Sequence, residues 1–262
     1  MLINLIGKNA LVGGSSRGIG LGIAKQLAQS GASVTLMARR EEQLREIVAS
    51  LETSSPEQNH QYLVVDFNDY KKYKAILKGY FAANTVDILI NNTQGPKAGT
   101  PLEMEVEDYQ QAFDTMFKTV AFTTQLAVEQ MKARKWGRII NVTSVSVKEP
   151  LSYLVLSNTI RAAVVAWAKS LATEVGSYQI TANNILTGYF DTERLKELNQ
   201  KKAEQHQIET SEVRDNMIDN VPLKRLGKPE EYGYLVAFLA SEQAAYINGA
   251  NIPIDGGLLK SL

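Results

Sequence analysis

The chain has no cysteine, and its 262 residues include only two histidines, His60 and His206. Without cysteine it cannot form disulfides, zinc ribbons or iron–sulfur clusters, and it has no thiol nucleophile. Two histidines are too few for a metal site built on several imidazoles, so we predict no metal centre. They also leave only two candidate bases for a Ser-His-Asp triad. Any chemistry must therefore come from hydroxyl, phenol or charged side chains, or from a bound cofactor.

The chain also lacks an excess of either charge and any long apolar run. Its 28 Lys and Arg residues balance 28 Asp and Glu residues, whereas a protein that binds nucleic-acid phosphates carries a basic excess. No run approaches the ~18 apolar residues that span a bilayer, and residues 1–6 lack the pattern of a signal peptide. We therefore expect a soluble cytoplasmic protein with neither a nucleic-acid nor a membrane partner.

Short apolar runs alternate with longer helical patterns along the whole chain. Because the runs are solidly apolar rather than alternating, they are typical of strands in a parallel sheet covered on both faces. We predict strands at 10–12, 33–37, 62–65, 86–90, 138–142, 180–186 and 250–254. Helices are expected at 19–30, 41–51, 70–81, 106–133, 158–175 and 229–240. The pattern predicts an α/β fold of the Rossmann type, with one doubly wound parallel sheet of about seven strands and helices on both faces.

No linker, repeat or compositional break divides the chain, so we predict a single domain over residues 1–262. Residues 193–220 are polar and helical in pattern, and we interpret them as an excursion from this domain. Such an excursion fits a mobile lid that closes over a cleft and excludes water. The alternative is an exposed pair of helices with no gating role.

Three glycines connect the first predicted strand to the first helix, with the spacing G-x-x-x-G-x-G. A dinucleotide site needs such glycines because the turn is tight, the backbone approaches the phosphates, and helix N-terminal N–H groups bind them. The strand–loop–helix context predicts dinucleotide binding, and the alternative is a loop whose glycines serve packing alone. The predicted cofactor-binding residues here are Gly14, Ser16, Arg17, Gly18, Ile19 and Gly20.

The end of the second strand indicates which dinucleotide is bound. An acidic residue there binds the ribose 2′-hydroxyl of NAD, whereas a nearby arginine suits the 2′-phosphate of NADP. This chain has Arg39 and Arg40 and no acid at that point, and Arg17 adds a further positive charge. Arginine matches phosphate as a planar fork of donors, so we predict NADP(H) rather than NAD(H), with Arg39 as a ligand. The alternative is that Arg39 and Arg40 are solvated surface charges.

These motifs and several others resemble the short-chain dehydrogenase/reductase family over nearly the whole chain. Residues 91–95 (NNTQG) resemble the family's N-N-A-G, and residues 137–144 (GRIINVTS) resemble its fifth strand, which ends in the catalytic serine. Residues 221–231 (VPLKRLGKPEE) and 255–257 (DGG) are similar to further family segments. In particular, the chain resembles the 3-oxoacyl-acyl-carrier-protein reductases.

The resemblance implies further cofactor contacts and an oligomer. It places Asp66 near the adenine, Asn91 at the end of the fourth strand, and Gly188 and Thr192 in the loop that contacts the carboxamide. It also implies that the long helical segments 106–133 and 158–175 pair across subunits, as a homotetramer or a homodimer.

The catalytic tetrad of that family is only partly present. The resemblance assigns the serine to Ser144, but the tyrosine position falls on Ser157, the lysine position on Arg161 and the asparagine position on Met116. Arg161 keeps a positive charge that can hold the ribose, yet it cannot release a proton because its pKa exceeds ~12. Ser157 can donate a hydrogen bond to a carbonyl oxygen but is a poor acid. The cofactor half of the site is therefore better preserved than the proton-transfer half.

Tyr153, one helical turn before Ser157, is the candidate replacement acid, and the alternative is an aromatic packing residue. The predicted catalytic residues are thus Ser144, Ser157, Arg161 and Tyr153. By resemblance, we expect an NADP(H)-dependent oxidoreductase that interconverts a small-molecule carbonyl and an alcohol, with an altered proton donor. The alternative is a nucleotide-binding pseudoenzyme with a regulatory or scaffolding role.

Overall fold

The computed structural model describes residues 3–261, apart from the side chain of Gln205. Its centre is a seven-stranded sheet in the order β3-β2-β1-β4-β5-β6-β7, and all neighbouring strands are parallel. The strands are β1 (Asn9–Gly13), β2 (Ser33–Ala38), β3 (Gln61–Val64), β4 (Ile88–Asn91), β5 (Gly137–Val142), β6 (Ile180–Thr187) and β7 (Asn251–Ile254). The predicted doubly wound Rossmann-type sheet is confirmed.

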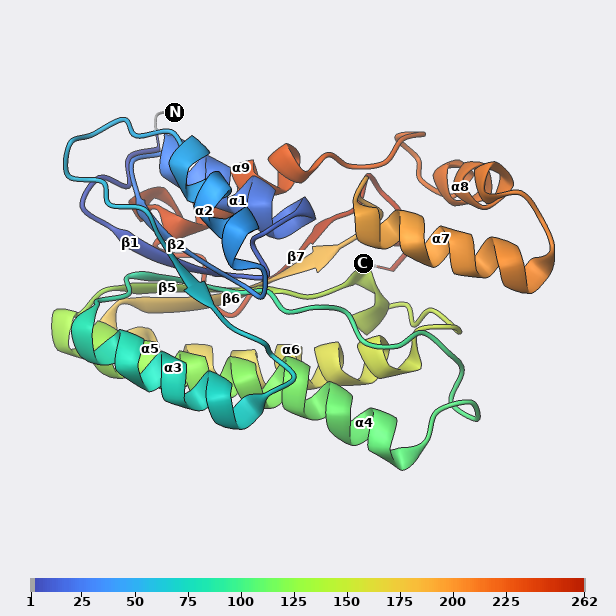
Figure 1. Cartoon of the computed structure of the whole chain (residues 1–262), viewed down its shortest axis with the longest axis horizontal. Coiled ribbons are helices and arrows are strands. Elements are labelled where there is room, and N and C mark those ends of the chain that lie inside the picture. Colours follow the sequence, from blue (N-terminus) through green and yellow to red (C-terminus); the bar gives the residue numbers. More distant parts are fainter. Residues whose placement is uncertain (1–2, 262) are drawn as a thin grey trace.

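Helices cover both faces of the sheet (Figure 1). One face carries α1 (Gly18–Gln29), α2 (Glu41–Ser50) and α9 (Pro229–Ala240), and the other carries α3 (Tyr70–Ala83), α5 (Thr119–Arg134) and α6 (Val155–Val175). The five central strands, β2, β1, β4, β5 and β6, therefore bury side chains on both sides, which explains their solid apolar runs in the sequence. Within residues 3–261, every helix is too short or too polar to cross a lipid bilayer.

The long helix predicted at 106–133 is interrupted in the structure. It consists of α4 (Val106–Phe113), a π-helical turn at Asp114–Lys118, and α5. Met116 lies in the π-helical turn and is only 3% exposed. A π-helical turn inserts an extra residue into the helical repeat, and such turns frequently mark functional sites. The π-helical turn thus lies at the position that the resemblance assigned to the tetrad asparagine, although methionine stands there.

Residues 193–220 are helical, as predicted, and form α7 (Glu193–His206) and α8 (Thr210–Asp219). The two helices project beyond the carboxyl ends of the strands (Figure 1). Despite their polar sequences they bury Ala203, Val213 and Met217. The hydroxyl of Thr192 caps α7 by accepting a hydrogen bond of 3.2 Å from the N–H of Leu195.

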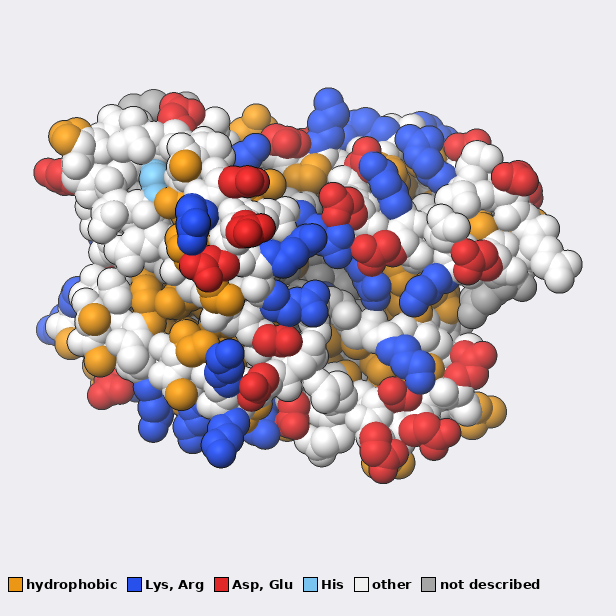
Figure 2. Space-filling view, viewed as in Figure 1, with side chains coloured by type: hydrophobic (Ala, Val, Ile, Leu, Met, Phe, Trp, Pro, Cys, Tyr) orange, Lys and Arg blue, Asp and Glu red, His pale blue; other side chains and the backbone are white. Residues whose placement is uncertain are grey.

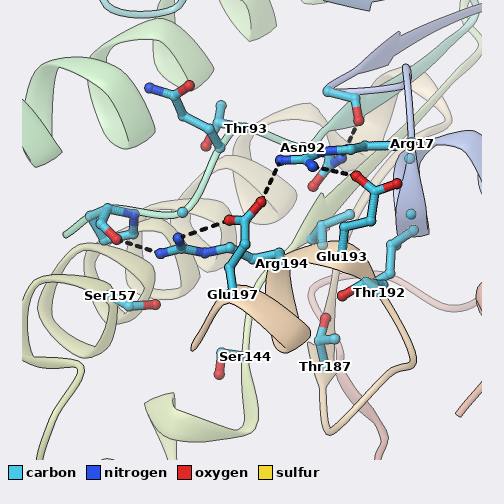
Figure 3. Close-up of a pocket in the computed structure, with 18 of the residues that line it drawn as sticks. Arg17, Asn92, Thr93, Ser144, Ser157, Thr187, Thr192, Glu193, Arg194 and Glu197 are labelled. Atoms are coloured by element: carbon cyan, nitrogen blue, oxygen red, sulfur yellow. Dashed lines mark hydrogen bonds and ion pairs between the residues drawn. The ribbon is translucent and has the colours of Figure 1, made fainter. Parts of the chain in front are cut away.

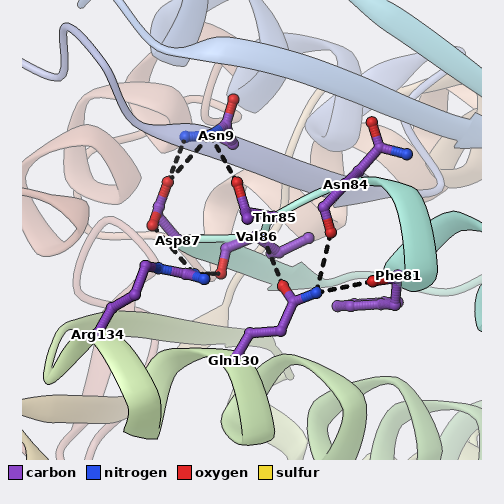
Figure 4. A network of polar contacts seen from close by, with 8 residues as sticks. All are labelled: Asn9, Phe81, Asn84, Thr85, Val86, Asp87, Gln130 and Arg134. Carbon is purple, nitrogen blue, oxygen red and sulfur yellow. Dashed lines mark hydrogen bonds and ion pairs between the residues drawn. The ribbon is translucent and has the colours of Figure 1, made fainter.

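Polar contacts fasten the amino end of the sheet to the helices (Figure 4). The Asp87 carboxylate accepts a hydrogen bond of 2.9 Å from the N–H of Asn9, and it pairs with Arg134 at 3.2 Å. Arg134 also donates to the carbonyl of Val86, whose N–H donates to the amide oxygen of Gln130. These contacts join β1, the residues directly before β4, and α5. They lie at the amino ends of the strands, opposite the carboxyl ends where doubly wound sheets bind ligands.

An asparagine ladder crosses the sheet from β4 to β7. Asn91 donates to Asn141 at 2.8 Å, Asn141 to Asn184 at 2.9 Å, and Asn184 to Asn251 at 2.8 Å. The four residues are partners in the strand register, so the amide groups follow one line across the sheet. Buried amides are stable only when they are hydrogen-bonded, and the ladder meets this need.

Candidate active site

A cavity of about 570 Å³ lies at the carboxyl ends of β1, β2, β4, β5 and β6. It includes the point between β1 and β4 where the strand order reverses, which is where doubly wound sheets bind their ligands. Lys and Arg side chains gather around the hollow at the centre of this face (Figure 2). We call this cavity at the carboxyl ends of the strands the strand-end cavity. Its lining includes the predicted residues Gly14, Ser16, Arg17, Gly18, Ile19, Gly20, Arg39, Ser144, Ser157, Arg161, Gly188 and Thr192.

The glycine loop forms a tight cradle on one side of this cavity. Gly14 and Gly18 have φ values of +54° and +55°, which side chains with a β-carbon rarely adopt. A β-carbon at Gly20 would lie 2.2 Å from the carbonyl oxygen of Gly14. The side-chain amide of Asn92 donates to the carbonyls of Gly13 at 3.0 Å and Gly14 at 3.3 Å. The loop therefore requires glycine at these positions, and the side chain of Asn92, which follows β4, fixes its backbone by hydrogen bonds.

The first helix leaves its N-terminus open to a ligand. Arg17 occupies the N-cap position without a side-chain cap, and the first turn of α1 contains no acidic residue. Uncapped N–H groups and the positive end of the helix dipole together favour an anion. The cradle and the open helix end thus fit the pyrophosphate of a dinucleotide.

Ser15 is a structural residue of this loop that sequence reasoning missed. Its hydroxyl donates to the carbonyl of Val12 at 2.9 Å and accepts from the N–H of Met37 at 3.0 Å, so it joins β1 to β2. Gly13 could not supply such a hydroxyl, because a β-carbon there would lie 2.3 Å from the carbonyl oxygen of Asn92. Ser15 supplies it two positions later.

A network of charged side chains crosses the mouth of the cavity (Figure 3). Arg17 forms ion pairs with Glu193 and, at 3.2 Å, with Glu197. Glu197 also pairs with Arg194 at 3.6 Å, and Arg194 donates to the carbonyl of Pro96 at 2.8 Å. The hydrogen bond from Arg17 lowers the pKa of Glu193. The glycine loop, α7 and the loop after β4 are thereby connected.

Sequence reasoning interpreted residues 193–220 as a lid over the cleft or an exposed pair of helices, and it assigned no site role to Glu193, Arg194 or Glu197. One feature of the sequence could have indicated that the two glutamates act together. Glu193 and Glu197 are four residues apart, so both lie on one face of a helix that begins at the end of the cleft.

Of the three predicted catalytic residues in the lining, Ser144 follows β5, and Ser157 and Arg161 lie on α6. The hydroxyl of Ser144 caps a 3₁₀ turn by accepting from the N–H of Ser146 at 3.1 Å. Arg161 donates to the Ser157 hydroxyl at 3.1 Å and to the carbonyl of Val142 at 2.5 Å. Burial lowers the pKa of Arg161, and the charge of Arg194 acts in the same direction. Two hydroxyls and a guanidinium therefore converge where the resemblance placed the tetrad.

Three other predicted residues lie outside the lining of the strand-end cavity, so their roles stay predictions. Burial raises the pKa of Tyr153 to about 12, which makes its phenol a weaker acid, and Lys202 lies 5.3 Å from the ring centre. The Asp66 carboxylate accepts from the N–H of Asn68 in a local turn. Asn91 is committed to the asparagine ladder, and the neighbouring Asn92 faces the cavity instead.

A second phenol is connected to the cavity through the hydroxyl group of one lining residue. Thr187, which lines the cavity, shares a hydrogen bond of 3.0 Å with the phenol of Tyr232 on α9. Burial raises the pKa of Tyr232, while the bond to Thr187 and the charge of Arg161 both oppose that rise. Sequence reasoning missed Tyr232 because it lies 45 positions from Thr187 and far from any catalytic motif.

The doubly wound sheet and the glycine cradle at its switch point define a dinucleotide-binding protein. Residues 14–259 match the model of a family described as enoyl-(acyl carrier protein) reductase. The NADPH-dependent reductase BacG of Bacillus subtilis (strain 168) is 30% identical over 97% of this chain and 99% of BacG. The 3-oxoacyl-[acyl-carrier-protein] reductase FabG of Chlamydia pneumoniae is 30% identical over 98% of this chain and 99% of FabG.

Solved structures agree with these relatives. The L-sorbose reductase of Gluconobacter frateurii, complexed with NADPH and L-sorbose, superposes with a TM-score of 0.91 at 30% identity and covers 100% of both chains. The chain belongs to the short-chain dehydrogenase/reductase family of NAD(P)-dependent oxidoreductases.

Proposed function

We propose that the protein is an NADP(H)-dependent oxidoreductase that interconverts a carbonyl and an alcohol. The observation that carries this proposal is the glycine cradle below an uncapped helix N-terminus, with Arg17, Arg39 and Arg40 in the cavity lining. The two residues directly after β2 are Arg39 and Arg40 rather than an acid that would bind a 2′-hydroxyl, and with Arg17 they bring three guanidiniums to the cavity for a 2′-phosphate. The names of BacG and of the sorbose reductase complex, both of which mention NADPH, support the same choice.

Side chains from the turn after β5 and from α6 position the substrate in this proposal. A nicotinamide dinucleotide held by the glycine cradle would supply or accept the hydride at the carbonyl carbon. The hydroxyls of Ser144 and Ser157 donate to the carbonyl oxygen, and the charge of Arg161 stabilises the alkoxide that develops there. Because Arg161 stays charged, the proton that completes the alcohol has to come from another group.

We propose that Thr187 and Tyr232 deliver that proton. The Thr187 hydroxyl faces the cavity and gives its proton to the alkoxide while it receives one from the phenol of Tyr232. The charge of Arg161 favours the tyrosinate that remains. Burial raises the pKa of both Tyr153 and Tyr232, but Tyr232 is hydrogen-bonded to Thr187, which lines the cavity. Tyr153, the acid suggested by the sequence, is therefore the alternative in this proposal.

The test is NADPH consumption with a panel of aldehydes, ketones and oxo acids. Turnover supports the oxidoreductase, and kcat falls at unchanged KM in Tyr232→Phe if the relay operates. Tyr73→Phe is the matched control, because Tyr73 is also a buried phenol, bonded to Thr123 at 2.6 Å, but it lies outside the cavity lining. An equal fall of kcat in Tyr153→Phe, with none in Tyr232→Phe, overturns the relay and favours Tyr153.

A pseudoenzyme is the second candidate, favoured by the loss of the tyrosine and lysine at Ser157 and Arg161. It predicts NADPH binding without turnover in the wild type. The double variant Ser157→Tyr and Arg161→Lys then creates activity that the parent lacks. Turnover by the wild type excludes this candidate.

We also propose that α7 and α8 form the lid over the cavity, supported by the ion pairs between α7 and Arg17. Self-association through α4, α5 and α6 is proposed as well. In support, the rings of Phe113 and Phe117 stack at 5.1 Å, Phe117 meets Trp167 at 5.9 Å, and Phe113 is 40% exposed. In sedimentation velocity, Phe113→Asp should dissociate the dimer or tetramer, and a wild type that sediments as a monomer contradicts the proposal.

A further inference from the structure

The predicted 2′-phosphate site is divided between two segments of the chain. Arg17 belongs to the glycine loop before α1, whereas Arg39 and Arg40 follow β2 and lead into α2. All three side chains line the strand-end cavity. Within residues 3–261, neither Arg39 nor Arg40 forms an ion pair, so no acidic partner fixes either guanidinium. Their distance from Arg17 therefore depends on how the backbone of the glycine loop is fastened to α2.

One side chain of α2 makes that connection. Gln43, the third residue of α2, donates from its amide nitrogen to the carbonyl of Ser16 at 3.0 Å. Ser16 directly precedes Arg17 and also lines the cavity. In the described part of the chain, this is the one hydrogen bond between α2 and the glycine loop. It therefore fixes the position of Ser16 and Arg17 relative to the helix that begins after Arg40.

The same side chain has a buried oxygen without a partner. The Oε1 atom of Gln43 is buried, and within residues 3–261 it accepts no hydrogen bond. A buried acceptor that makes no hydrogen bond lowers stability, and native structures contain few of them. An apolar side chain of similar length would avoid this cost. Glutamine at this position is therefore explained by what its amide nitrogen does for Ser16 rather than by a contribution to folding.

A different amide fixes the part of the glycine loop that faces the predicted pyrophosphate. The side chain of Asn92 donates to the carbonyls of Gly13 and Gly14 from the segment after β4. NADPH and NADH share the pyrophosphate and differ in the 2′-phosphate, so this contact serves both dinucleotides. The bond from Gln43 instead joins the two segments that carry the arginines predicted to bind the 2′-phosphate.

We propose that Gln43 is a positioning residue that determines the preference for NADPH over NADH. Through Ser16 it holds the guanidinium of Arg17 close to those that follow β2, so that one phosphate can bind all three. Gln43 itself lies outside the lining of the cavity, so it acts through these residues and not by contact with the cofactor. This inference rests on the proposed function, because it names a residue that sets the cofactor preference of the same site.

The experiment titrates NADPH and NADH by fluorescence and records thermal melts of the wild type, Gln43→Met and Gln43→Glu. Methionine keeps the length of glutamine but has neither the donor nor the unpaired oxygen. We expect NADPH to bind Gln43→Met about three- to tenfold more weakly, the loss expected for one hydrogen bond, while the dissociation constant of NADH changes by less than about twofold. Glutamate also lacks the donor and adds a negative charge, so Gln43→Glu should weaken NADPH binding further. The melting temperature of Gln43→Met should equal or exceed that of the wild type.

Two control variants separate this role from general support of the loop. Gln26→Met replaces a half-buried glutamine of α1 whose side chain, in the described chain, donates only to Ser30, at 3.4 Å. This variant should bind both dinucleotides like the wild type. Asn92→Ala should weaken the binding of NADPH and NADH alike, because both use the pyrophosphate cradle.

The ratio of the two dissociation constants decides the outcome. Equal weakening of NADPH and NADH binding by Gln43→Met, with or without a lower melting temperature, assigns Gln43 a structural role and overturns the inference. A wild type that prefers NADPH and a Gln43→Met variant that keeps this preference contradict the inference alone. A wild type that prefers NADH, or binds neither dinucleotide, contradicts the proposed function and this inference with it.

Discussion

Replacing Glu197 by glutamine should tighten NADPH binding. Glu197 lies on α7 and pairs with Arg17 at 3.2 Å and with Arg194 at 3.6 Å. In the proposed complex Arg17 has to exchange its carboxylates for the cofactor phosphate. Glutamine has the same shape as glutamate but no charge, so the variant removes this competition without opening a cavity.

The size of the effect follows from the exposure of the pair. The side chains of Arg17 and Glu197 are 41% and 46% exposed, so water and salt screen their interaction. Exposed ion pairs of this kind contribute about 0.2–1 kcal/mol. The dissociation constant of NADPH should therefore fall about 1.4- to fivefold in Glu197→Gln. The gain should shrink as ionic strength rises, because the Debye length falls below ~8 Å above physiological salt.

The assay is a fluorescence titration of NADPH at low and high ionic strength. Glu204→Gln is the matched control, since Glu204 lies exposed on the same helix and its carboxylate accepts only from Gln200 in the described chain. The control should bind NADPH like the wild type. Unchanged or weaker binding by Glu197→Gln refutes the idea that α7 competes with the cofactor for Arg17.

Three further predictions concern the loop, the missing acid and acid stability. Gly20→Ala should weaken NADPH binding more than about tenfold in the same titration, because its β-carbon meets a carbonyl oxygen at 2.2 Å; normal affinity contradicts the cradle. Ser157→Tyr with Arg161→Lys should raise the kcat of carbonyl reduction about 100-fold, and no gain argues against a missing acid. The hydrogen bond from Arg225 lowers the pKa of the Glu231 carboxyl to about 2. The pair therefore stabilises the folded protein fully above the ordinary pKa of 4.5, and this stabilisation is lost as the pH falls towards 2. Thermal melts of the wild type and Glu231→Gln should therefore converge at low pH, and a gap that persists there contradicts the pair.

The fold was predictable from the sequence because its signals are local. Solid apolar runs mark strands with helices on both faces, and the glycine loop identifies its own place between β1 and α1. The π-helical turn at Asp114–Lys118 was missed because the pattern on both sides is helical, and one inserted residue leaves little trace in it. Asn91 was assigned to the cofactor by its motif, whereas the ladder depends on strand register, which no single segment displays.

The candidate site was predictable where its residues belong to motifs. Ser144, Ser157 and Arg161 were located by resemblance, and all three line the strand-end cavity. The pair of Arg17 with Glu193 joins residues 176 positions apart, and only the folded chain brings them together. Long-range pairs of this kind decide the electrostatics of the cavity, so its charge balance could not be deduced from composition, which is neutral overall.

The most direct test of NADP(H) dependence is a paired titration with NADPH and NADH. NADPH fluorescence should change on binding, and the dissociation constant of NADPH should be at least about tenfold below that of NADH because of charge-assisted hydrogen bonds to the 2′-phosphate. Arg39→Gln should weaken NADPH binding, so that the two dissociation constants become more similar, and it should leave the dissociation constant of NADH unchanged. Absence of binding by either dinucleotide, or tighter binding of NADH, contradicts the account.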